Sequence, residues 1–218
     1  MPAPPRSPPD HSAALAQYRR RAGVCDLELA LFEPVRRQAI ARLAPRPGET
    51  VLDVGCGTGL SLPLLRQRVG AGGRIVGIEQ CLEMIEQARE RVTQHRWHNV
   101  ELLNESAEAA TMSGRADAAI FHFTHDILRE PQAIANVMKQ LKPGARVVAS
   151  GLQWAGLWAW PVNLFVLGAA LRSVTTLEGL GRPWSHLARS LAGIRVDSAM
   201  AGGVYIVSGS VIDKETRA

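Results

Sequence analysis

Cysteine is scarce in this chain of 218 residues, and its scarcity excludes a disulfide framework. The three cysteines, Cys25, Cys56 and Cys81, are far apart and form neither a CxxC pair nor a Cys/His metal spacing. We therefore expect a reduced, cytoplasmic location and no bound metal.

Lysine is almost missing as well, since only 3 of the 25 basic residues are lysines. The formal net charge of +5 is also unevenly placed: residues 1–48 carry eight arginines against four acids, whereas residues 49–218 carry 17 basic and 16 acidic groups. A near-neutral main body argues against a nucleic-acid surface, which needs clustered positive charge. We expect no nucleic-acid partner.

The chain also lacks a clean hydrophobic run long enough to be read as a membrane span. Residues 152–171 contain no charge, but they include Gln153, Asn163 and a central Pro161. This pattern predicts two short segments broken at Pro161 and no membrane span, and it leaves peripheral contact with a membrane open.

The order of patterns along the chain indicates one domain. Residues 1–12 hold five of the thirteen prolines and predict a disordered tail. Residues 13–218 form the domain: N-terminal helices over 13–47, a core over 48–150, a lid or acceptor region over 151–192 and a C-terminal hairpin over 193–218. In the first helical stretch, Ala13–Leu43, the apolar side chains fall on one face and Arg36, Arg37 and Arg42 project elsewhere.

Short apolar runs alternate with helical patterns from residue 50 onward. The expected strands cover residues 50–54, 74–79, 99–103, 117–123, 145–150, 194–200 and 204–211. Continuous apolar runs joined by helices of ten to twelve residues are typical of a parallel sheet covered on both faces. The fold class is therefore α/β: a Rossmann-like, doubly wound, seven-stranded sheet, mostly parallel, with an antiparallel C-terminal strand.

The most specific segment is VLDVGCGTG at residues 51–59, in which a strand runs into a glycine-rich turn and then a helix. The spacing is G-x-G-x-G, whereas a dinucleotide-binding turn has G-x-G-x-x-G. Asp53 before the turn would repel a pyrophosphate but suits an ammonium or sulfonium group. Glu79, twenty residues after Gly59, ends the next strand, where it is placed to accept hydrogen bonds from ribose hydroxyls.

These motifs resemble those of the class I S-adenosylmethionine-dependent methyltransferases over residues 48–150. DVGCGTG matches the first motif, Gly77-Ile78-Glu79-Gln80 the second, residues 101–108 the third, and LKPG with the next strand a later one. The small-molecule branch typified by ubiquinone and menaquinone biosynthesis looks nearest.

The resemblance implies S-adenosylmethionine as the cofactor and assigns residues to its parts. Asp53, Gly55 and Gly57 would hold the methionine end, Glu79 the ribose, and Gln80 and Met84 would lie along the adenine. Where the third motif often has Asp, this chain has Ser106-Ala107, and Ser106 can still accept a hydrogen bond. The full set expected to contact the cofactor is Asp53, Gly55, Cys56, Gly57, Gly59, Glu79, Gln80, Met84, Ser106, Ala107 and Phe121.

The acceptor is expected beyond the fourth strand, in Phe121-His122-Phe123-Thr124-His125-Asp126. His122, His125 or Asp126 is a candidate for removing a proton from the acceptor; the alternative is that one histidine caps the next helix and the other packs. Four of the five tryptophans lie between residues 151 and 190. Their clustering favours an aromatic pocket wall, with a core or dimer surface as the alternative; the candidate acceptor-binding residues are Trp154, Trp158, Trp160 and Tyr18.

The expected function is methyl transfer from S-adenosylmethionine to a small, lipophilic or aromatic molecule. Three alternatives stay open: a nicotinamide-dependent oxidoreductase, a nucleic-acid methyltransferase and a non-enzymatic binding module on the same fold. The glycine spacing disfavours the first, and FHFTHD in place of an Asn/Asp-Pro-Pro-Tyr motif disfavours the second. The sequence leaves monomer and homodimer open.

Overall fold

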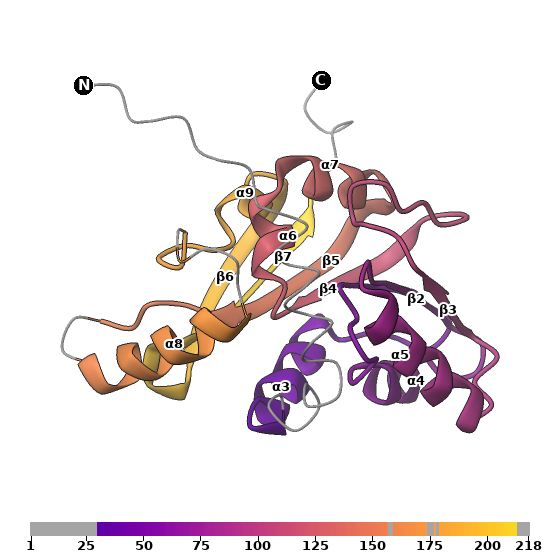
Figure 1. Ribbon diagram of the computed structural model, residues 1–218. Coiled ribbons are helices and arrows are strands. Elements are labelled where there is room, and N and C mark those ends of the chain that lie inside the picture. Colours follow the sequence, from indigo (N-terminus) through magenta and orange to yellow (C-terminus); the bar gives the residue numbers. More distant parts are fainter. Residues whose placement is uncertain (1–29, 157–158, 174–176, 178, 213–218) are drawn as a thin grey trace, which may run out of the picture.

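A single sheet runs through the computed structural model, which describes residues 30–212 apart from 157–158, 174–176 and 178 (Figure 1). Its seven strands lie in the order β3-β2-β1-β4-β5-β7-β6. Their bounds are β1 Thr50–Val54, β2 Arg74–Ile78, β3 Val100–Leu103, β4 Ala116–His122, β5 Leu141–Leu152, β6 Leu191–Ala199 and β7 Val204–Val211.

The pairing directions confirm the predicted fold class. Strands β1 to β5 pair in parallel, while β7 runs antiparallel to both β5 and β6. At the centre, Val54 of β1 pairs with Ile78 of β2 and with Phe121 of β4. The carboxyl ends of β1, β2 and β4 therefore meet at one edge, which is where ligands bind in sheets of this kind.

Helices cover both faces of the sheet, as expected for apolar strands. In Figure 1, α3, α4, α5 and α8 lie on one side and α6, α7 and α9 on the other. Their bounds are α3 Glu33–Leu43, α4 Leu62–Val69, α5 Leu82–Gln94, α6 His125–Arg129, α7 Pro131–Lys139, α8 Trp160–Ser173 and α9 Ser185–Ala188, and a short 3-10 turn, η1, spans Met200–Gly202.

Two apolar clusters, one on each face, hold these layers together. Leu52 and Val54 of β1 pack toward α6 and α7, whereas Val51 of the same strand packs toward α3 and α4. Alternate residues of a strand point to opposite faces, so a continuous apolar run buries both.

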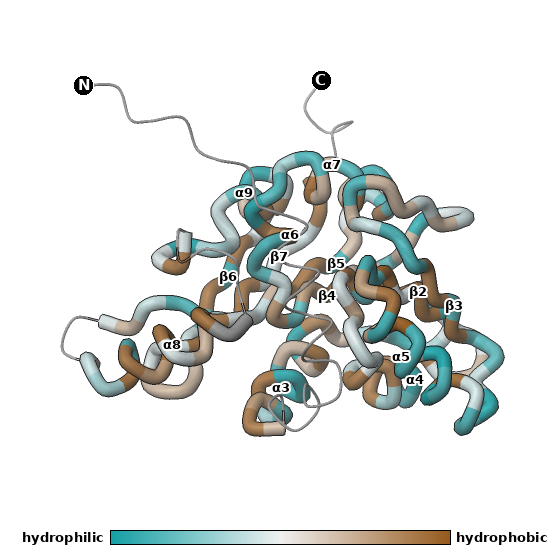
Figure 2. Tube along the Cα trace, in the orientation of Figure 1, coloured by the Kyte–Doolittle hydropathy of each residue, from teal (hydrophilic) through white to brown (hydrophobic). Residues whose placement is uncertain are grey.

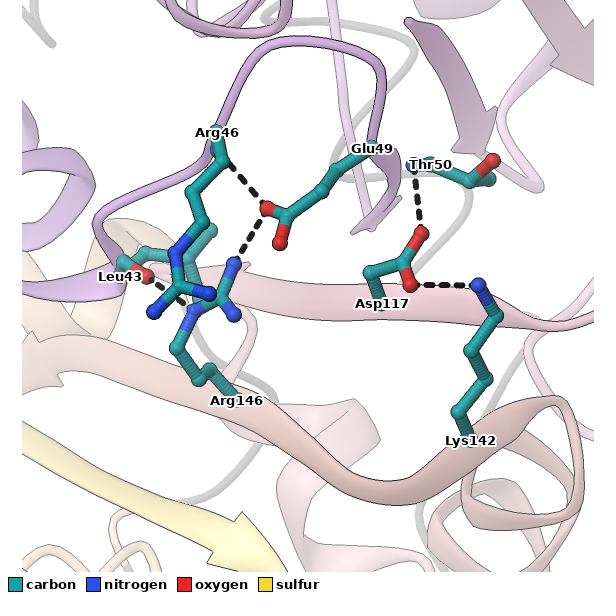
Figure 3. Close-up of polar contacts among 7 residues, drawn as sticks. All are labelled: Leu43, Arg46, Glu49, Thr50, Asp117, Lys142 and Arg146. Carbon is teal, nitrogen blue, oxygen red and sulfur yellow. Dashed lines mark hydrogen bonds and ion pairs between the residues drawn. The ribbon is translucent and has the colours of Figure 1, made fainter.

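The amino ends of the central strands are joined by a network of charged groups (Figure 3). The carboxylate of Glu49 accepts a 2.8 Å hydrogen bond from the Arg46 N–H and pairs with the Arg146 guanidinium, whose Nε donates to the Leu43 carbonyl. Asp117 accepts from the Thr50 N–H at 2.9 Å and pairs with Lys142. Partial burial alone would raise the pKa of Asp117, but the hydrogen bonds from Lys142 and Thr50 outweigh it and lower the pKa below its usual value.

The structure differs from the sequence predictions at several boundaries. The strand expected at residues 145–150 is longer in the structure, since β5 begins at Leu141 and its register with β4 shifts between Ala116 and Ala118. Residues 160–173 form one helix with Pro161 in its first turn, where proline costs no hydrogen bond. The prediction that the chain breaks into two segments at Pro161 was therefore wrong. The last pair of strands is β6 at Leu191–Ala199 and β7 at Val204–Val211, close to the predicted hairpin.

Two predictions concern segments that the structure does not describe. The proline-rich tail at residues 1–12 and most of the expected helix over Ala13–Leu43 lie before residue 30; α3 is the described part of that helix. Within the described ranges, no helix combines the length and the apolar character needed to cross a bilayer.

Candidate active site

The glycine turn after β1 is bound directly to the end of β2. The N–H groups of Gly55 and Cys56 both donate to the Ile78 carbonyl, at 2.8 and 3.0 Å. The Gly57 N–H donates to Glu79 Oε2 at 3.0 Å, and the Cys81 N–H donates to Glu79 Oε1 at 2.8 Å. Burial raises the pKa of Glu79, against these backbone donors, which lower it. Glu79 is thus held in one orientation beside the turn, and its contact with a ribose stays a prediction.

Gly57 keeps the space beside the turn open. Its φ of +56° belongs to the left-handed region, and a Cβ built there would have Met84 Sδ as its nearest neighbour, 4.0 Å away. A ligand can therefore approach the backbone of the turn at this point. Met84 of α5 borders this space, and Gln80 follows the end of β2 in the sequence.

The segment after β3 closes the far side of this region. Asn104 donates from Nδ2 to the carbonyls of Glu79 and Gln80, at 2.9 and 3.2 Å, and so ties the segment to the end of β2. Ser106 is partly exposed, and the Ala107 carbonyl accepts from Asn136. The contact of Ser106 and Ala107 with the adenine therefore stays a prediction.

Three further residues that were predicted to contact the cofactor are packed against other parts of the protein. Cys56 is a free, buried thiol within the turn, and a Cβ on Gly59 would collide with Leu62 Cδ1 at 2.7 Å. Phe121 is fully buried in the cluster that contains Leu52 and Val54. A cofactor contact from Phe121 would therefore have to come from its main chain.

Asp53 is a buried carboxylate whose Oδ2 has no hydrogen-bond partner among the described residues. Burial raises its pKa to about 7; the positive charge of Arg36 lowers the pKa and the charge of Glu79 raises it. An unpaired buried carboxylate is costly, so its retention indicates a cationic ligand group.

Arg36 was predicted to project away from the apolar face of its helix, and this was wrong. The residue is only 2% exposed, and its charge acts on both Asp53 and His122. One guanidinium nitrogen pairs with Glu33, but Nε is buried without a partner in the described chain. The guanidinium therefore enters the site from α3 with an unused donor.

His122 and Ser150 form a pair across β4 and β5, where they are register partners. His122 Nδ1 lies 2.6 Å from Ser150 Oγ, and Ser150 is fully buried. Burial and, to a smaller extent, the positive charge of Arg36 together lower the pKa of His122 to about 3. The ring is thus uncharged, and its Nε2 and the nearby Thr124 Oγ1 are buried without partners among the described residues.

The other two candidates for proton removal start α6. His125 is buried, and Asp126 follows it, partly exposed. His125 therefore shares the carboxyl edge of the sheet with His122, which keeps the prediction of a catalytic role open for both. No group of three or more His, Cys, Asp or Glu suited to a metal lies within the described ranges.

An aromatic cluster of phenylalanines borders this edge. Phe123 has a left-handed φ of +57°, and its ring lies 4.6 Å from that of Phe32 before α3 and 4.8 Å from the His122 ring. Phe32 in turn lies 6.4 Å from Phe165 of α8. Such backbone strain in a non-glycine residue is typical of functional sites.

The described tryptophans between residues 151 and 190 lie in different surroundings. Trp160 at the start of α8 is 69% exposed and Trp154 is 37% exposed, while Trp184 packs against Tyr205 in the cluster on the opposite face. Tyr18 and Trp158 lie outside the described residues. A tryptophan wall of the acceptor pocket therefore stays a prediction, while the phenylalanine cluster lies next to His122.

Comparison with known proteins identifies the family. A model of the methyltransferase domain matches residues 45–158, which is more than half of the chain. The chain is 28% identical over 161 residues to a nocamycin O-methyltransferase from Saccharothrix syringae, covering 72% of this chain and 58% of that one. It is 35% identical over 127 residues to an arsenite methyltransferase from Halobacterium salinarum, covering 57% and 31%.

Among solved structures, the N-methyltransferase NodS from Bradyrhizobium japonicum in complex with S-adenosyl-L-homocysteine aligns with a TM-score of 0.67. The identity is 16%, and the alignment covers 92% of this chain and 99% of NodS. This chain belongs to the class I S-adenosylmethionine-dependent methyltransferases, as the motifs predicted. It spans 58% and 31% of the lengths of the two relatives named above.

The site fits the cofactor of this family. A methionine end offers an ammonium and a carboxylate, which match the unpaired oxygen of Asp53 and the unpaired Nε of Arg36. The open space at Gly57 and the oriented carboxylate of Glu79 match an adenosine beside the turn. Sequence reasoning missed Arg36 and Ser150; no sequence pattern distinguishes the buried Arg36 from the exposed Arg37 and Arg42 of the same helix.

Proposed function

We propose that this protein transfers a methyl group from S-adenosylmethionine to a small, lipophilic or aromatic acceptor. One observation carries the proposal: four buried polar atoms at the carboxyl edge have no partner among the described residues. They are Arg36 Nε, Asp53 Oδ2, His122 Nε2 and Thr124 Oγ1. Folded proteins rarely leave such atoms unpaired, so their concentration at one edge indicates groups that bind ligands.

The first two atoms serve the cofactor in this proposal. Asp53 accepts from the ammonium of the methionine end, and Arg36 donates to its carboxylate. Glu79 accepts from ribose hydroxyls with the lone pairs that Gly57 and Cys81 leave unused, while Gln80, Met84, Ser106 and Ala107 surround the adenine. When bound, S-adenosylmethionine supplies a methyl group on a positively charged sulfur, which is open to attack by a nucleophile.

In this proposal the other two atoms, His122 Nε2 and Thr124 Oγ1, contact the methyl acceptor. An imidazole with a pKa of about 3 is a weak base, so His122 orients the acceptor atom by a hydrogen bond more than it removes a proton. Ser150 fixes the ring orientation through Nδ1. Transfer then depends on in-line positioning and exclusion of water, and it favours an atom that is nucleophilic without a strong base, such as a phenolate or carboxylate oxygen.

The surroundings support a lipophilic acceptor. Phe32, Phe123 and Phe165 form a cluster beside His122, and aromatic rings bind apolar or aromatic molecules with little loss of side-chain entropy. The relative from Saccharothrix syringae is an O-methyltransferase, which supports an oxygen acceptor. A reduced, cytoplasmic location remains part of the proposal and is supported by the free thiols of Cys56 and Cys81.

The proposal is tested with S-adenosylmethionine labelled in its methyl group. The purified protein is incubated with an extract of cells, and the extract is separated into small-molecule, protein and nucleic-acid fractions before mass spectrometry. We expect label in an organic-soluble small molecule with wild type and none with Glu79→Gln. Label confined to nucleic acid or protein, or no label in any fraction, would overturn the proposal.

A further inference from the structure

Helix α8 presents apolar side chains to solvent as well as to the core. Its inner face packs Val166 and Ala170, both fully buried, into the cluster that also contains Val204 and Ile206 of β7. On its outer face Trp160, Leu164 and Leu171 are 69%, 63% and 64% exposed. These three residues are four and seven positions apart and therefore lie along one side of the helix.

No charged residue interrupts α8 between Trp160 and Leu171. In Figure 1 the helix lies at the margin of the molecule, below β6, and in Figure 2 brown and pale segments make up most of it. A surface helix normally carries polar residues on its outer side, and one that is apolar all round is normally covered. The outer face of α8 is thus a candidate contact surface.

The charges around this face point to the partner. Residues 151–199 contain four arginines, Arg172, Arg182, Arg189 and Arg195, against two acids, Glu178 and Asp197. Arg189 follows α9 on the opposite side of the sheet and does not belong to this face. Arg182 is exposed and follows Leu180, which packs in the same cluster as Val166.

Arg195 lies on the same side of the sheet as α8. It shares a face of β6 with Asp197, which pairs with Arg42 of α3 at 2.6 Å, and with Ala199, which packs on the cluster of α8. The exposed apolar face is therefore accompanied by exposed positive charge, with a tryptophan at the start of the helix.

We propose that the outer face of α8 binds the surface of a bilayer that contains anionic phospholipid. The apolar side chains enter the boundary between headgroups and acyl chains, Trp160 lies at the level of the headgroups, and Arg182 and Arg195 interact with the negative headgroups. Phe165 connects this helix to the ring cluster beside His122, so the contact sets the acceptor side of the molecule next to the lipid. Membrane contact in this form does not require methyl transfer.

The test measures sedimentation of the full chain with vesicles, without cofactor. Vesicles of phosphatidylcholine mixed with phosphatidylglycerol are compared with phosphatidylcholine alone, at low and high salt. We expect wild type to bind the mixed vesicles, with loss of binding at high salt. The double variant Leu164→Glu/Leu171→Glu should bind them at least about tenfold more weakly, because it places charges in the apolar boundary.

Two further variants serve as comparisons. Val196→Glu changes a 45% exposed apolar residue on the side of β6 opposite to Asp197 and should bind as wild type does. Arg182→Gln/Arg195→Gln should lose the preference for phosphatidylglycerol. Circular dichroism and binding of S-adenosylhomocysteine show that each variant is folded.

Three results would overturn the inference. The first is that the wild-type protein sediments with neither kind of vesicle. The second is that the Leu164→Glu/Leu171→Glu variant binds the mixed vesicles as well as the Val196→Glu variant does. A dimer in analytical ultracentrifugation that Leu164→Glu/Leu171→Glu abolishes, with no vesicle binding, would assign the face to a second copy of this chain. None of these results depends on whether the protein transfers a methyl group.

Discussion

The two ends of the central strands use the same residue types to different effect. At the amino ends, the carboxylates of Glu49 and Asp117 are paired with Arg146 and Lys142. At the carboxyl ends, Asp53 and Arg36 each keep a buried polar atom without a partner among the described residues. Paired charges lower the pKa of Asp117, whereas burial raises that of Asp53 to about 7.

This difference separates charges that hold the fold together from charges that await a ligand. A carboxylate whose folded pKa is lowered contributes to stability, and one whose pKa is raised by burial reduces stability when it ionises. The unpaired buried groups at the carboxyl ends of the strands therefore cost stability, and we propose that this cost is kept because these groups bind a ligand. Matched substitutions at the two edges test this interpretation.

The largest expected effect on the free energy of unfolding comes from replacing one glycine by alanine at each end of the central strands. Gly55 and Gly144 both have a φ of +71°, but a Cβ on Gly55 would lie 2.4 Å from Thr124 Cγ2, whereas one on Gly144 meets nothing within 4 Å. Gly144→Ala should lower the free energy of unfolding by about 1 kcal/mol through its backbone conformation. Gly55→Ala should lower it by about 3 kcal/mol because the clash adds to the strain.

Urea denaturation of both variants measures this difference. Equal losses for the two glycines would mean that the contact between the turn and the start of α6 is loose. The site would then be less rigid than the structure indicates.

The second prediction compares the two aspartates. Asp53→Asn should raise the free energy of unfolding by about 2 kcal/mol at pH 8, because it removes a carboxylate that is costly to ionise when buried. The gain should be absent below pH about 4, where Asp53 is largely protonated in both states, should grow as the pH rises from there to about 7, and should level off above that pH. Affinity for S-adenosylhomocysteine should fall by about tenfold or more, since its ammonium loses an ionic partner.

Asp117→Asn is the matched control. It should lower the free energy of unfolding by up to about 1 kcal/mol at neutral pH, because Asp117 is partly exposed and its ion pair is screened. The loss should shrink as the pH falls through the lowered pKa of Asp117. The affinity of Asp117→Asn for S-adenosylhomocysteine should not change. If Asp53→Asn lost stability as Asp117→Asn does, Asp53 would be a structural carboxylate like Asp117, and the two ends of the strands would not differ.

The third prediction concerns the two arginines. Arg36→Gln should weaken binding of S-adenosylhomocysteine by about tenfold and leave 5′-methylthioadenosine, which lacks the amino-acid end, almost unaffected. Arg146→Gln should leave the affinity for both ligands unchanged, because Arg146 contacts Glu49 and the Leu43 carbonyl at the amino ends of the strands. Calorimetry with both ligands makes the comparison, and equal losses for the two ligands with Arg36→Gln would show a merely structural role.

The smallest effect is expected at Ser150. Ser150→Ala removes the hydroxyl that orients His122, so kcat with the identified acceptor should fall by about threefold to tenfold while affinity for the cofactor stays unchanged. A fall in cofactor affinity with unchanged kcat would place the His122 and Ser150 pair at the cofactor end.

The arrangement of the glycine turn beside Glu79 was predictable because it depends on short, consecutive motifs. A strand, a glycine turn and a following acid define Asp53, Gly57 and Glu79, and the parallel order of β1 and β2 brings them together. Arg36 was not predictable, because a charged residue beside an apolar helix face normally points to solvent. Its burial follows only from the packing of α3 against the sheet.

The acceptor half depends on contacts between distant parts of the chain. Ser150 looks like any small strand residue until β5 is placed beside β4, which makes it the partner of His122. The density of tryptophans in residues 151–190 suggested a pocket, but a composition does not say which face a side chain takes. The structure places Trp184 in the core and Trp160 in solvent.

Calorimetric titration of the full chain with S-adenosylhomocysteine, and separately with NADH, tests the central claim most directly. The unpaired charges at the carboxyl edge predict one binding site with micromolar affinity for S-adenosylhomocysteine, a loss of that affinity in Asp53→Asn, and no binding of NADH. Binding of NADH without S-adenosylhomocysteine, or equal affinity of wild type and Asp53→Asn for S-adenosylhomocysteine, would contradict it.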